Sequence, residues 1–518
     1  DQAGIDILTQ VAQVDQKVGL SIDQLKNIIC DYDGLMIRSG TQVTSDVISE
    51  AKKLRIIGRA GVGVDNVDVP TATRKGVLVV NSPGGNTIAA AEHALAMILA
   101  LSRNIPQAHA SMFSGGWDRK KYVGNELYKK ILGVVGLGKI GSHVAKVANA
   151  MGMEVIGFDP FVSSERAQQM QVRLSDIEEL FKKSDYVTLH LPRTPETENL
   201  VDMDLLRKMK PTARLVNCAR GGIINENDLA NALEENVIQG AAIDVYAKEP
   251  LAENSPLRAV KKGLVLTPHL GASTVEAQQN VAIDVAEQIR DVLLGLPARS
   301  AVNIPGLSAE IMDSLKPHLK LAETLGLLVS QISGGQIQKL EVRLQGEFAQ
   351  HPSQPLVIAT LKGLLTSALG DKINYVNASL EAKGRGIDVV EIKDELSPEF
   401  ARGSLQLDSF SDKGGHSVSG TVFVDGDLGI TSIDEYPINF VPSRHMLFTR
   451  HRDMPGIIGQ IGSLLGKHNV NIASMQVGRR IVRGEAVMVL SIDDPIPSEL
   501  LGAILSMQGI NEAHSVTL

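Results

Sequence analysis

A single stretch, residues 131–159 (ILGVVGLGKIGSHVAKVANAMGMEVIGFD), limits what this chain can fold into more than any other. It opens with a short apolar run rich in β-branched residues, which is typical of a buried parallel strand. The order G-x-G-x-x-G follows, then a helical segment over residues 140–151 and a second apolar run that ends at Asp159. Strand, glycine motif, helix and strand in this order predict a dinucleotide-binding Rossmann unit.

The glycine motif and the acid that follows it indicate which dinucleotide binds. Gly136 permits the tight turn, Gly138 lets the backbone approach a pyrophosphate, and Gly141 lets the helix pack against the strand. The helix start supplies N–H groups and a positive dipole end for the phosphates. Asp159, 18 residues after Gly141, can accept hydrogen bonds from ribose hydroxyls and would repel a 2′-phosphate. A glycine-rich turn in another α/β protein would not explain this context, so we expect NAD as the cofactor.

Length and charge exclude several classes of protein. A chain of 518 residues is too long for one hydrophobic core, so we expect three or more domains. The net charge of −8 provides no basic surface for nucleic acid and no polybasic membrane patch. No apolar run reaches the roughly 18 residues that a transmembrane helix needs. We therefore expect no nucleic-acid partner and no membrane association.

Two cysteines, Cys30 and Cys218, in so long a chain indicate a reducing compartment and exclude a disulfide framework. No cluster with metal-ligand spacing is visible in the sequence, so we expect no metal. The chain begins at Asp1 with a helix-like segment rather than with methionine and a strand, which predicts that a few residues precede it. We expect a cytoplasmic protein, or one of the plastid stroma if a transit peptide has been removed.

Three short apolar strands before residue 81 form a small α/β unit, and two of them end near an arginine. Arg38 and Arg59 close the first and second strands, and the loop NSPGGNT follows the third. Ligands bind beyond the carboxyl ends of strands in open α/β sheets, so both arginines face the expected crevice. Guanidinium groups bind phosphate and carboxylate in bidentate fashion, which predicts an anion site. The glycine-rich loop could present backbone N–H groups to a carboxylate, or it could be a plain connection.

Further strands between residues 186 and 267 end before residues that are suited to acid–base chemistry. His269 can donate or accept the proton on a substrate oxygen, because an imidazole titrates near working pH. Glu249 can orient that ring and raise its proton affinity. Arg220 can clamp a carboxylate and polarise the adjacent carbonyl, while NAD supplies the redox chemistry. Together these residues predict hydride transfer to or from a 2-hydroxy acid.

Four segments, VNCARGGIINENDL, DVYAKEP, TPHLGAS and GRAGVGVDNVD, resemble the signatures of the D-isomer-specific 2-hydroxyacid dehydrogenases. The resemblance covers roughly Arg38 to Ile304 and implies two Rossmann-like domains with Arg220, Glu249 and His269 in the catalytic positions. Val62 departs from the family pattern, since some relatives carry threonine near the cofactor at this position. The backbone of Val62 can still serve in place of that side chain. The resemblance also implies NAD contacts at further positions, namely Lys139, Ile140, Leu191, Cys218, Ala219, Arg220, Asp244, His269, Leu270, Gly271 and Ala272.

Within that family, MIRSGTQVT, NSPGGNT and WDRKK look like the phosphate- and carboxylate-binding segments of one kind of member. These members oxidise a phosphorylated three-carbon 2-hydroxy acid, D-3-phosphoglycerate, with NAD in the first committed step of serine biosynthesis. Arg119 would join the phosphate site from a neighbouring subunit. The implied substrate contacts are Arg38, Ser39, Arg59, Asn81, Gly84, Gly85 and Arg119.

The end of the chain has its own pattern of secondary structure. Residues 445–516 predict the order βαββαβ, which is the ferredoxin-like split pattern. The segment RHRDMPGIIGQIGSLLGKHNVNIASM resembles an ACT domain, a regulatory module that binds amino acids between two copies. Asp453 and Asn471 match the positions that hold serine in serine-regulated members. The resemblance implies L-serine as an effector and a homo-oligomer, either a dimer or a tetramer.

The region before this tail is similar to the intervening domain of the long form of the enzyme, and it mixes strands with glycine-rich turns in an α+β arrangement. The basic segment KGRG at residues 383–386 could hold an anion, although such a turn is more often a solvated loop. We expect a linker near Pro305 and Gly306. The predicted domains are residues 1–86 with 273–302 for the substrate, 87–272 for NAD, 303–443 for the intervening domain and 444–518 for the ACT domain.

Two other functions share parts of this pattern. A glyoxylate or hydroxypyruvate reductase would have the same fold and catalytic residues, but it usually lacks the tail and prefers NADPH, which Asp159 disfavours. A noncatalytic Rossmann regulator that senses NAD would not need Arg220, Glu249 and His269 together. Trp117, beside DRKK, could anchor a subunit interface or could pack within the chain.

Overall fold

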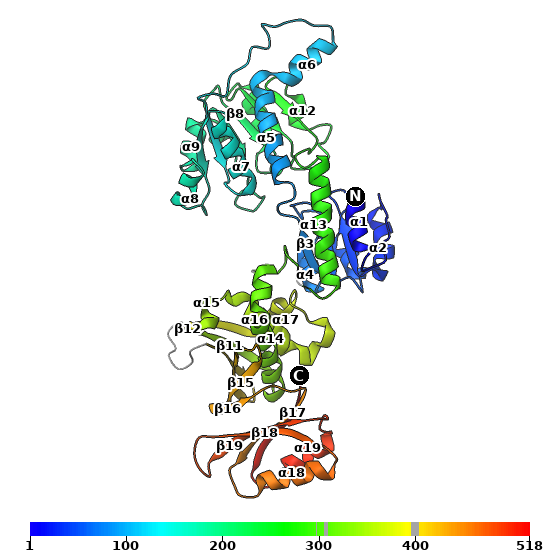
Figure 1. Ribbon diagram of the computed structural model, residues 1–518. Helices are drawn as coiled ribbons and strands as arrows, with labels where there is room; N and C mark the ends of the chain where they lie inside the picture. Colours follow the sequence, from blue (N-terminus) through cyan, green and yellow to red (C-terminus); the bar gives the residue numbers. More distant parts are fainter. Residues whose placement is uncertain (297, 305–308, 395–402) are drawn as a thin grey trace. The chain divides into compact units, whose positions relative to one another are not determined.

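The computed structural model describes residues 1–296, 298–304, 309–394 and 403–518 (Figure 1). The predicted linker at Pro305 and Gly306 lies outside these residues. The chain divides into two compact units. The first contains Asp1–Gln10, Ala60–Gly63 and Ser82–Ala286, and the second contains Val11–Arg59, Val64–Asn81 and Glu287–Leu518.

The first unit is built on a parallel sheet of seven strands in the order β10-β9-β8-β7-β4-β5-β6. β4, the first of these strands in the chain, pairs with β5 on one side and with β7 on the other, so the strand order reverses beside it. Ligands of doubly wound sheets bind at such a switch point. The strands are β4 (Ile131–Val135), β5 (Glu154–Phe158), β6 (Arg173–Leu174), β7 (Tyr186–Leu189), β8 (Arg214–Asn217), β9 (Gly240–Ile243) and β10 (Leu264–Leu266).

Helices cover both faces of this sheet, which explains why its strands are apolar along their whole length. One core contains buried residues of α9 (Ile177–Lys183), α10 (Met203–Leu206) and α11 (Glu226–Glu234). The other contains buried residues of α5 (Thr87–Arg103) and α7 (Lys139–Ala150). The remaining helices of the described chain in or bordering this unit are α1 (Gln2–Leu8), α6 (Ile105–Phe113), α8 (Ser164–Gln169), α12 (Pro256–Ala259) and α13 (Val275–Leu293).

The second unit begins with a parallel sheet of three strands, β1 (Gly34–Ile37), β2 (Ile56–Arg59) and β3 (Leu78–Asn81). Ile37 pairs with Arg59 and Arg59 pairs with Asn81, so the three strands end at one level. The predicted α/β unit is therefore confirmed. Its connections carry α2 (Ile22–Ile28), the short 3₁₀ turn Ile29–Asp31, α3 (Ser45–Glu50) and α4 (Val69–Arg74).

The middle of the second unit is an α+β arrangement, as predicted. A mixed sheet of six strands has the order β12-β11-β13-β14-β15-β16. Two long helices, α14 and α16, cross so closely that an added Cβ at Gly326 would lie 2.2 Å from Thr360 O, and one at Gly363 would lie 2.0 Å from Glu323 O. The predicted basic turn at residues 383–386 is corrected in part, because Lys383 and Gly384 end helix α17.

The elements of this part are α14 (Ala309–Ile332), β11 (Ile337–Gln345), α15 (Glu347–Gln350), α16 (Ser353–Leu369), the 3₁₀ turn Gly370–Lys372, α17 (Ala378–Gly384), β12 (Asp388–Asp394), β13 (Ser404–Ser411), β14 (Gly414–Val422), β15 (Leu428–Ile433) and β16 (Tyr436–Phe440).

The tail has the predicted βαββαβ order, in a sheet arranged β18-β19-β17-β20. Figure 1 shows α18 and α19 on the same side of this sheet, and buried residues of both helices share one core with its strands. Three glycines of α18, at positions 459, 462 and 466, have open space where a side chain would be. The elements are β17 (His445–Arg452), α18 (Ile457–Lys467), β18 (Ile472–Arg479), β19 (Glu485–Ile492), α19 (Ser498–Leu505) and β20 (Ile510–Thr517).

Apolar side chains are exposed in and after α6. Phe113 is 84%, Trp117 78% and Val123 77% exposed. Trp117 is therefore not packed within the described chain, and its role at an interface stays a prediction. In the described part of the chain no single helix is long and apolar enough to cross a membrane, although α5 and α6, bent by 64°, pass that test as a pair.

Candidate active site

The turn after β4 has the shape that a dinucleotide phosphate needs. Gly136 has φ +95°, in the region that favours glycine. An added Cβ at Gly141 would lie 1.9 Å from Gly136 O, whereas one at Gly138 would meet open space. Gly138 also caps α7 without a side-chain hydrogen bond, so the first N–H groups of the helix remain available to an anion. The geometry at the three glycines is therefore compatible with the three roles that the motif predicts.

Asp159 is fixed at the end of β5, next to this turn. Its two carboxylate oxygens accept hydrogen bonds from Leu137 N at 2.8 Å and Phe161 N at 2.9 Å. The side chain is half-buried, and each oxygen keeps a lone pair that a ribose hydroxyl could use. The geometry is therefore compatible with the predicted contact to the ribose.

The two residues predicted for acid–base chemistry form a bonded pair. His269 Nδ1 lies 2.7 Å from Glu249 Oε2, and the other oxygen of Glu249 accepts the Tyr246 N–H at 3.1 Å. The hydrogen bond to Glu249 raises the pKa of His269 above its ordinary value, against the effect of burial. Burial alone would raise the pKa of Glu249, but the bonds from His269 and Tyr246 outweigh it and lower that pKa. Because Nδ1 is engaged, Nε2 is the nitrogen that can act on a substrate.

Arg220 belongs to the same cluster, at the turn that follows β8. The Asn217 amide donates to Arg220 O at 2.9 Å and accepts from Ala219 N at 3.0 Å, so one side chain shapes the turn. The positive charge of Arg220 lowers the pKa of His269, which opposes the effect of Glu249. The structure therefore brings the three predicted catalytic residues together, beyond the carboxyl ends of β8, β9 and β10.

Asp244 holds the segment that carries His269. Its buried carboxylate accepts hydrogen bonds from Thr267 Oγ1 at 2.6 Å, Leu270 N at 2.7 Å and Gly271 N at 2.9 Å. The His269 N–H donates to Asp244 O at 2.9 Å, while His269 itself has φ +57°. Asp244 thereby holds the backbone of His269 in its left-handed conformation, which sets the direction of the imidazole ring.

His93 completes this arrangement, and the sequence did not predict it as a site residue. Its Nε2 lies 3.2 Å from Asp244 Oδ1. Burial would raise the pKa of Asp244, but the bonds from His93, Thr267 and Leu270 outweigh burial and lower that pKa. The signal for His93 was its place as a polar interruption in the apolar stretch of residues 89–101. That signal does not identify the partner, because the contact depends on how α5 packs on the sheet.

The other predicted cofactor contacts lie at the same edge of the sheet. Lys139 and Ile140 are in the first turn of α7. Leu191 follows β7, and Cys218 and Ala219 follow β8. Burial raises the pKa of the Cys218 thiol, which stays protonated. Leu270, Gly271 and Ala272 follow β10, so all these positions lie at the carboxyl edge of the sheet.

The seven predicted substrate residues divide between the two units. Arg38, Ser39, Arg59 and Asn81 are in the second unit, and Gly84, Gly85 and Arg119 are in the first. In the second unit, the Asn66 amide donates to Arg38 O at 3.0 Å and Thr41 O at 2.6 Å, which holds the loop after β1. The level strand ends place Arg38, Arg59 and Asn81 at one sheet edge. The joining of all seven into one site stays a prediction.

The two predicted serine contacts each have another partner. Asp453 Oδ2 accepts hydrogen bonds from Arg479 Nη1 at 2.8 Å and from Arg483 N at 3.3 Å. The Asn471 amide donates to Asp493 Oδ2 at 2.8 Å. The hydrogen bond from Arg479 is the main reason that the pKa of Asp453 is lowered. Their role as effector contacts stays a prediction.

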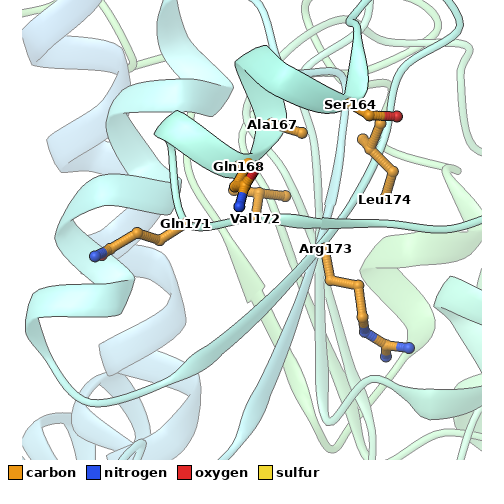
Figure 2. Close-up of a pocket in the computed structure, with 7 residues that line it drawn as sticks. All are labelled: Ser164, Ala167, Gln168, Gln171, Val172, Arg173 and Leu174. Carbon is orange, nitrogen blue, oxygen red and sulfur yellow. The ribbon is translucent and has the colours of Figure 1, made fainter.

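A hollow of about 490 Å³ lies between α8 and β6 (Figure 2). None of the predicted site residues lines it. In Figure 2 the side chains of Gln171 and Arg173 extend in different directions, and Arg173 pairs with Glu154 and Glu179. Polar groups do not converge here as they do around Asp244, so the hollow is not a candidate catalytic site.

Comparison with known proteins covers nearly the whole chain. Residues 95–271 match the NAD binding domain of D-isomer specific 2-hydroxyacid dehydrogenase, residues 314–434 match the D-3-phosphoglycerate dehydrogenase intervening domain, and residues 445–507 match the ACT domain. D-3-phosphoglycerate dehydrogenase of Synechocystis is 60% identical over 100% of this chain and 93% of its own length. The enzyme of the same name from Methanocaldococcus jannaschii is 44% identical over 99% and 97%.

A solved structure supports the fold of part of the chain. A crystal structure of a Thermus thermophilus protein superimposes with a TM-score of 0.54 and 32% sequence identity. It covers 58% of this chain and 96% of its own. The likeness therefore extends over rather more than half of this chain.

Proposed function

This chain belongs to the D-3-phosphoglycerate dehydrogenase family, in the long form with an intervening domain and an ACT domain, and on that premise we propose which residues carry its reaction. It is an NAD-dependent oxidoreductase that converts D-3-phosphoglycerate to 3-phosphohydroxypyruvate, the first step of serine biosynthesis. The observation that carries the residue assignment is the 2.7 Å bond between His269 and Glu249, with Arg220 beside it.

The glycine turn after β4 fits NAD. The open space at Gly138 and the uncapped start of α7 suit a pyrophosphate, and Asp159 suits a ribose diol. When bound, NAD supplies the acceptor for the hydride that leaves C2 of the substrate. Asp159 would repel the 2′-phosphate of NADP, which also disfavours a glyoxylate or hydroxypyruvate reductase. A noncatalytic NAD sensor would not need the bonded acid–base pair.

His269 acts as the general base. Its Nε2 takes the proton of the substrate 2-hydroxyl, and Glu249 stabilises the imidazolium that results. Arg220 binds the carboxylate in bidentate fashion and orients C2. In the reverse direction, His269 returns the proton to the carbonyl oxygen. Asp244 and His93 position the segment that carries His269 and take no proton.

The second unit supplies the phosphate site in this proposal. Arg38 and Arg59 bind the phosphate of the substrate, while Ser39, Asn81, Gly84 and Gly85 surround its carboxylate end. Arg119 joins from a neighbouring subunit, across an interface to which the exposed Trp117 belongs. The support is the level ends of β1, β2 and β3, since parallel strands present ligand groups at their carboxyl ends.

The tail is proposed to regulate the enzyme. Two tails pair and enclose L-serine, with Asp453 receiving its ammonium group and Asn471 its hydroxyl. The chain then acts as a homo-oligomer, a dimer or a tetramer, with domain limits at residues 86, 272, 302 and 443. Free cysteines and the chloroplastic relatives of Arabidopsis support a reducing compartment, the cytoplasm or the plastid stroma.

The experiment that tests the proposal measures initial rates with D-3-phosphoglycerate and either NAD or NADP, with and without L-serine. We expect turnover with NAD, much slower turnover with NADP, and inhibition by L-serine. Equal use of both cofactors would contradict the role of Asp159. If calorimetry detects no binding of L-serine to the intact enzyme, the regulatory proposal fails, while the assignment of the dehydrogenase residues stands.

A further inference from the structure

Three side chains that can bind metal meet in the second unit, and none of them has been given a role so far. His318 lies on α14, and Glu347 and His351 lie at the two ends of α15. One nitrogen of each imidazole and one carboxylate oxygen of Glu347 lie within 4.8 Å of one another. The two imidazole rings have their centroids 5.1 Å apart. The sequence did not indicate this cluster, because α14 and α15 are separated by β11.

The two histidines carry buried nitrogens without partners. Neither Nδ1 of His318 nor Nε2 of His351 makes a hydrogen bond to any described residue, although both atoms are shielded from solvent. Buried polar side-chain atoms in folded proteins nearly always have a partner, and exceptions call for an unseen water or ion. Two such exceptions on neighbouring rings, with a carboxylate oxygen within 4.8 Å of a nitrogen of each, point to a missing group.

A neighbouring aromatic ring already positions one of the two imidazoles. The Phe348 ring packs edge-on against the His318 ring, with centroids 4.7 Å apart, and Phe348 is buried. That contact holds the imidazole in place before any ion arrives.

We propose that His318, Glu347 and His351 bind one divalent transition-metal ion of the zinc type. Two imidazoles and one carboxylate form a donor set that zinc accepts with water in the fourth position. Calcium and magnesium are excluded by this set, since they require a shell of oxygen ligands. Glu347 is exposed and provides the route of entry. The ion would tie α14 to the connection between β11 and α16.

A second group of potential ligands, His93, Cys218 and Asp244, serves as an internal contrast. There the polar atoms already have partners, because Asp244 bonds to His93, Thr267 and two backbone N–H groups. Burial also keeps the Cys218 thiol protonated by raising its pKa. This group belongs to the active site, and a metal ion would have to displace the bonds that position His269.

The test uses the full-length enzyme, stripped with a chelator and titrated with Zn²⁺ by calorimetry and with Co²⁺ by visible spectroscopy. We expect one ion per chain, with the absorption bands of low-coordinate cobalt. His318→Gln and His351→Gln should each weaken binding by about 100-fold, given that even outer-shell changes cost 10- to 100-fold. His109→Gln, on the exposed surface of α6, is the matched control and should bind as the wild type does.

Glu347→Gln is the variant that should fold as the wild type does, because the Glu347 side chain is exposed and its replacement disturbs no core. It should weaken Zn²⁺ binding while circular dichroism and turnover of D-3-phosphoglycerate stay as in the wild type. No binding by the wild-type enzyme would overturn the proposal. Undiminished binding by the His318→Gln/His351→Gln double variant would also overturn it and would direct attention to His93, Cys218 and Asp244.

Discussion

The active site and the predicted serine site differ in how far one chain completes them. At the candidate active site His269 is bonded to Glu249, Glu249 is bonded to the backbone, and Asp244 fixes the segment that carries His269. In the tail, the half-buried Asp453 and the exposed Asn471 each bond to a different side chain of their own domain. Chemistry needs groups that are oriented in advance, whereas a regulatory ligand can replace partners that exchange with it.

The difference predicts that substitutions at the active site act on every turnover, while those in the tail act only when the effector is present.

Replacing His269 is the most severe test of the candidate active site, because it removes the proposed general base. His269→Ala should lower kcat by roughly 10²- to 10⁴-fold, because general acid–base catalysis is lost. Binding of NAD, measured by fluorescence titration, should stay near the wild-type value. His468→Ala, an exposed histidine of the tail, is the matched control and should keep full activity. A His269→Ala enzyme with more than a tenth of the wild-type kcat would exclude His269 as the base.

The phosphate contact is expected to give the next largest effect. Arg38→Ala should lower kcat/KM for D-3-phosphoglycerate by about 10- to 100-fold, since a hydrogen bond to a charged group contributes roughly 1.5–3 kcal/mol. The loss should be much smaller for an unphosphorylated 2-hydroxy acid. Arg74→Ala, in the same unit, is the control for a general loss of positive charge. Equal losses on both substrates would mean that Arg38 supports the fold or the carboxylate.

The pH dependence of kcat/KM measures how strongly Glu249 is coupled to His269. Oxidation requires neutral His269, and Glu249 raises the pKa of that imidazole, so kcat/KM should rise with pH through a value above the ordinary histidine range. Glu249→Gln should lower kcat and move the inflection to lower pH. Glu226→Gln is the matched control, because Glu226 bonds to the neighbouring Ala247 N–H and is not a partner of His269. An unmoved inflection would contradict the coupling.

The tail should give the smallest effect on basal turnover. Asp453→Ala should keep wild-type rates without L-serine and lose inhibition by L-serine, because the acceptor for the ammonium group is gone. Asp494→Ala, at another exposed acid of the tail, is the matched control and should keep the inhibition. Retained inhibition in Asp453→Ala would show that another group receives the ammonium, and the contrast between the two sites would lose its basis.

The sequence predicted those parts of the molecule that depend on neighbours along the chain. The glycine motif and Asp159 act through one strand, one helix and the next strand, so spacing alone was sufficient. The βαββαβ order of the tail followed from periodicity in the same way. The three predicted catalytic residues could be grouped because strand ends of a parallel sheet converge on one edge, which is a property of the fold class.

The contacts that the sequence missed depend on tertiary packing. His93 reaches Asp244 because α5 lies on the sheet, and nothing local marks that partnership. His318 meets His351 only because α14 packs beside the connection after β11. Asp453 and Asn471 were predicted by resemblance, yet their bonds to Arg479 and Asp493 follow from side-chain positions that no pattern specifies.

The glycines of the long helices lead to opposite expectations for mutational tolerance. At Gly326 and Gly363 any side chain would overlap a carbonyl of the facing helix. In a saturation-mutagenesis screen for folded enzyme, only glycine should therefore be recovered at these two positions. At the three open positions of α18 nothing stands in the way of alanine, and each glycine costs its helix about 1 kcal/mol relative to alanine. Thermostability engineering of this enzyme would therefore begin in α18, and sequence drift should be fastest there unless the open face is needed for assembly.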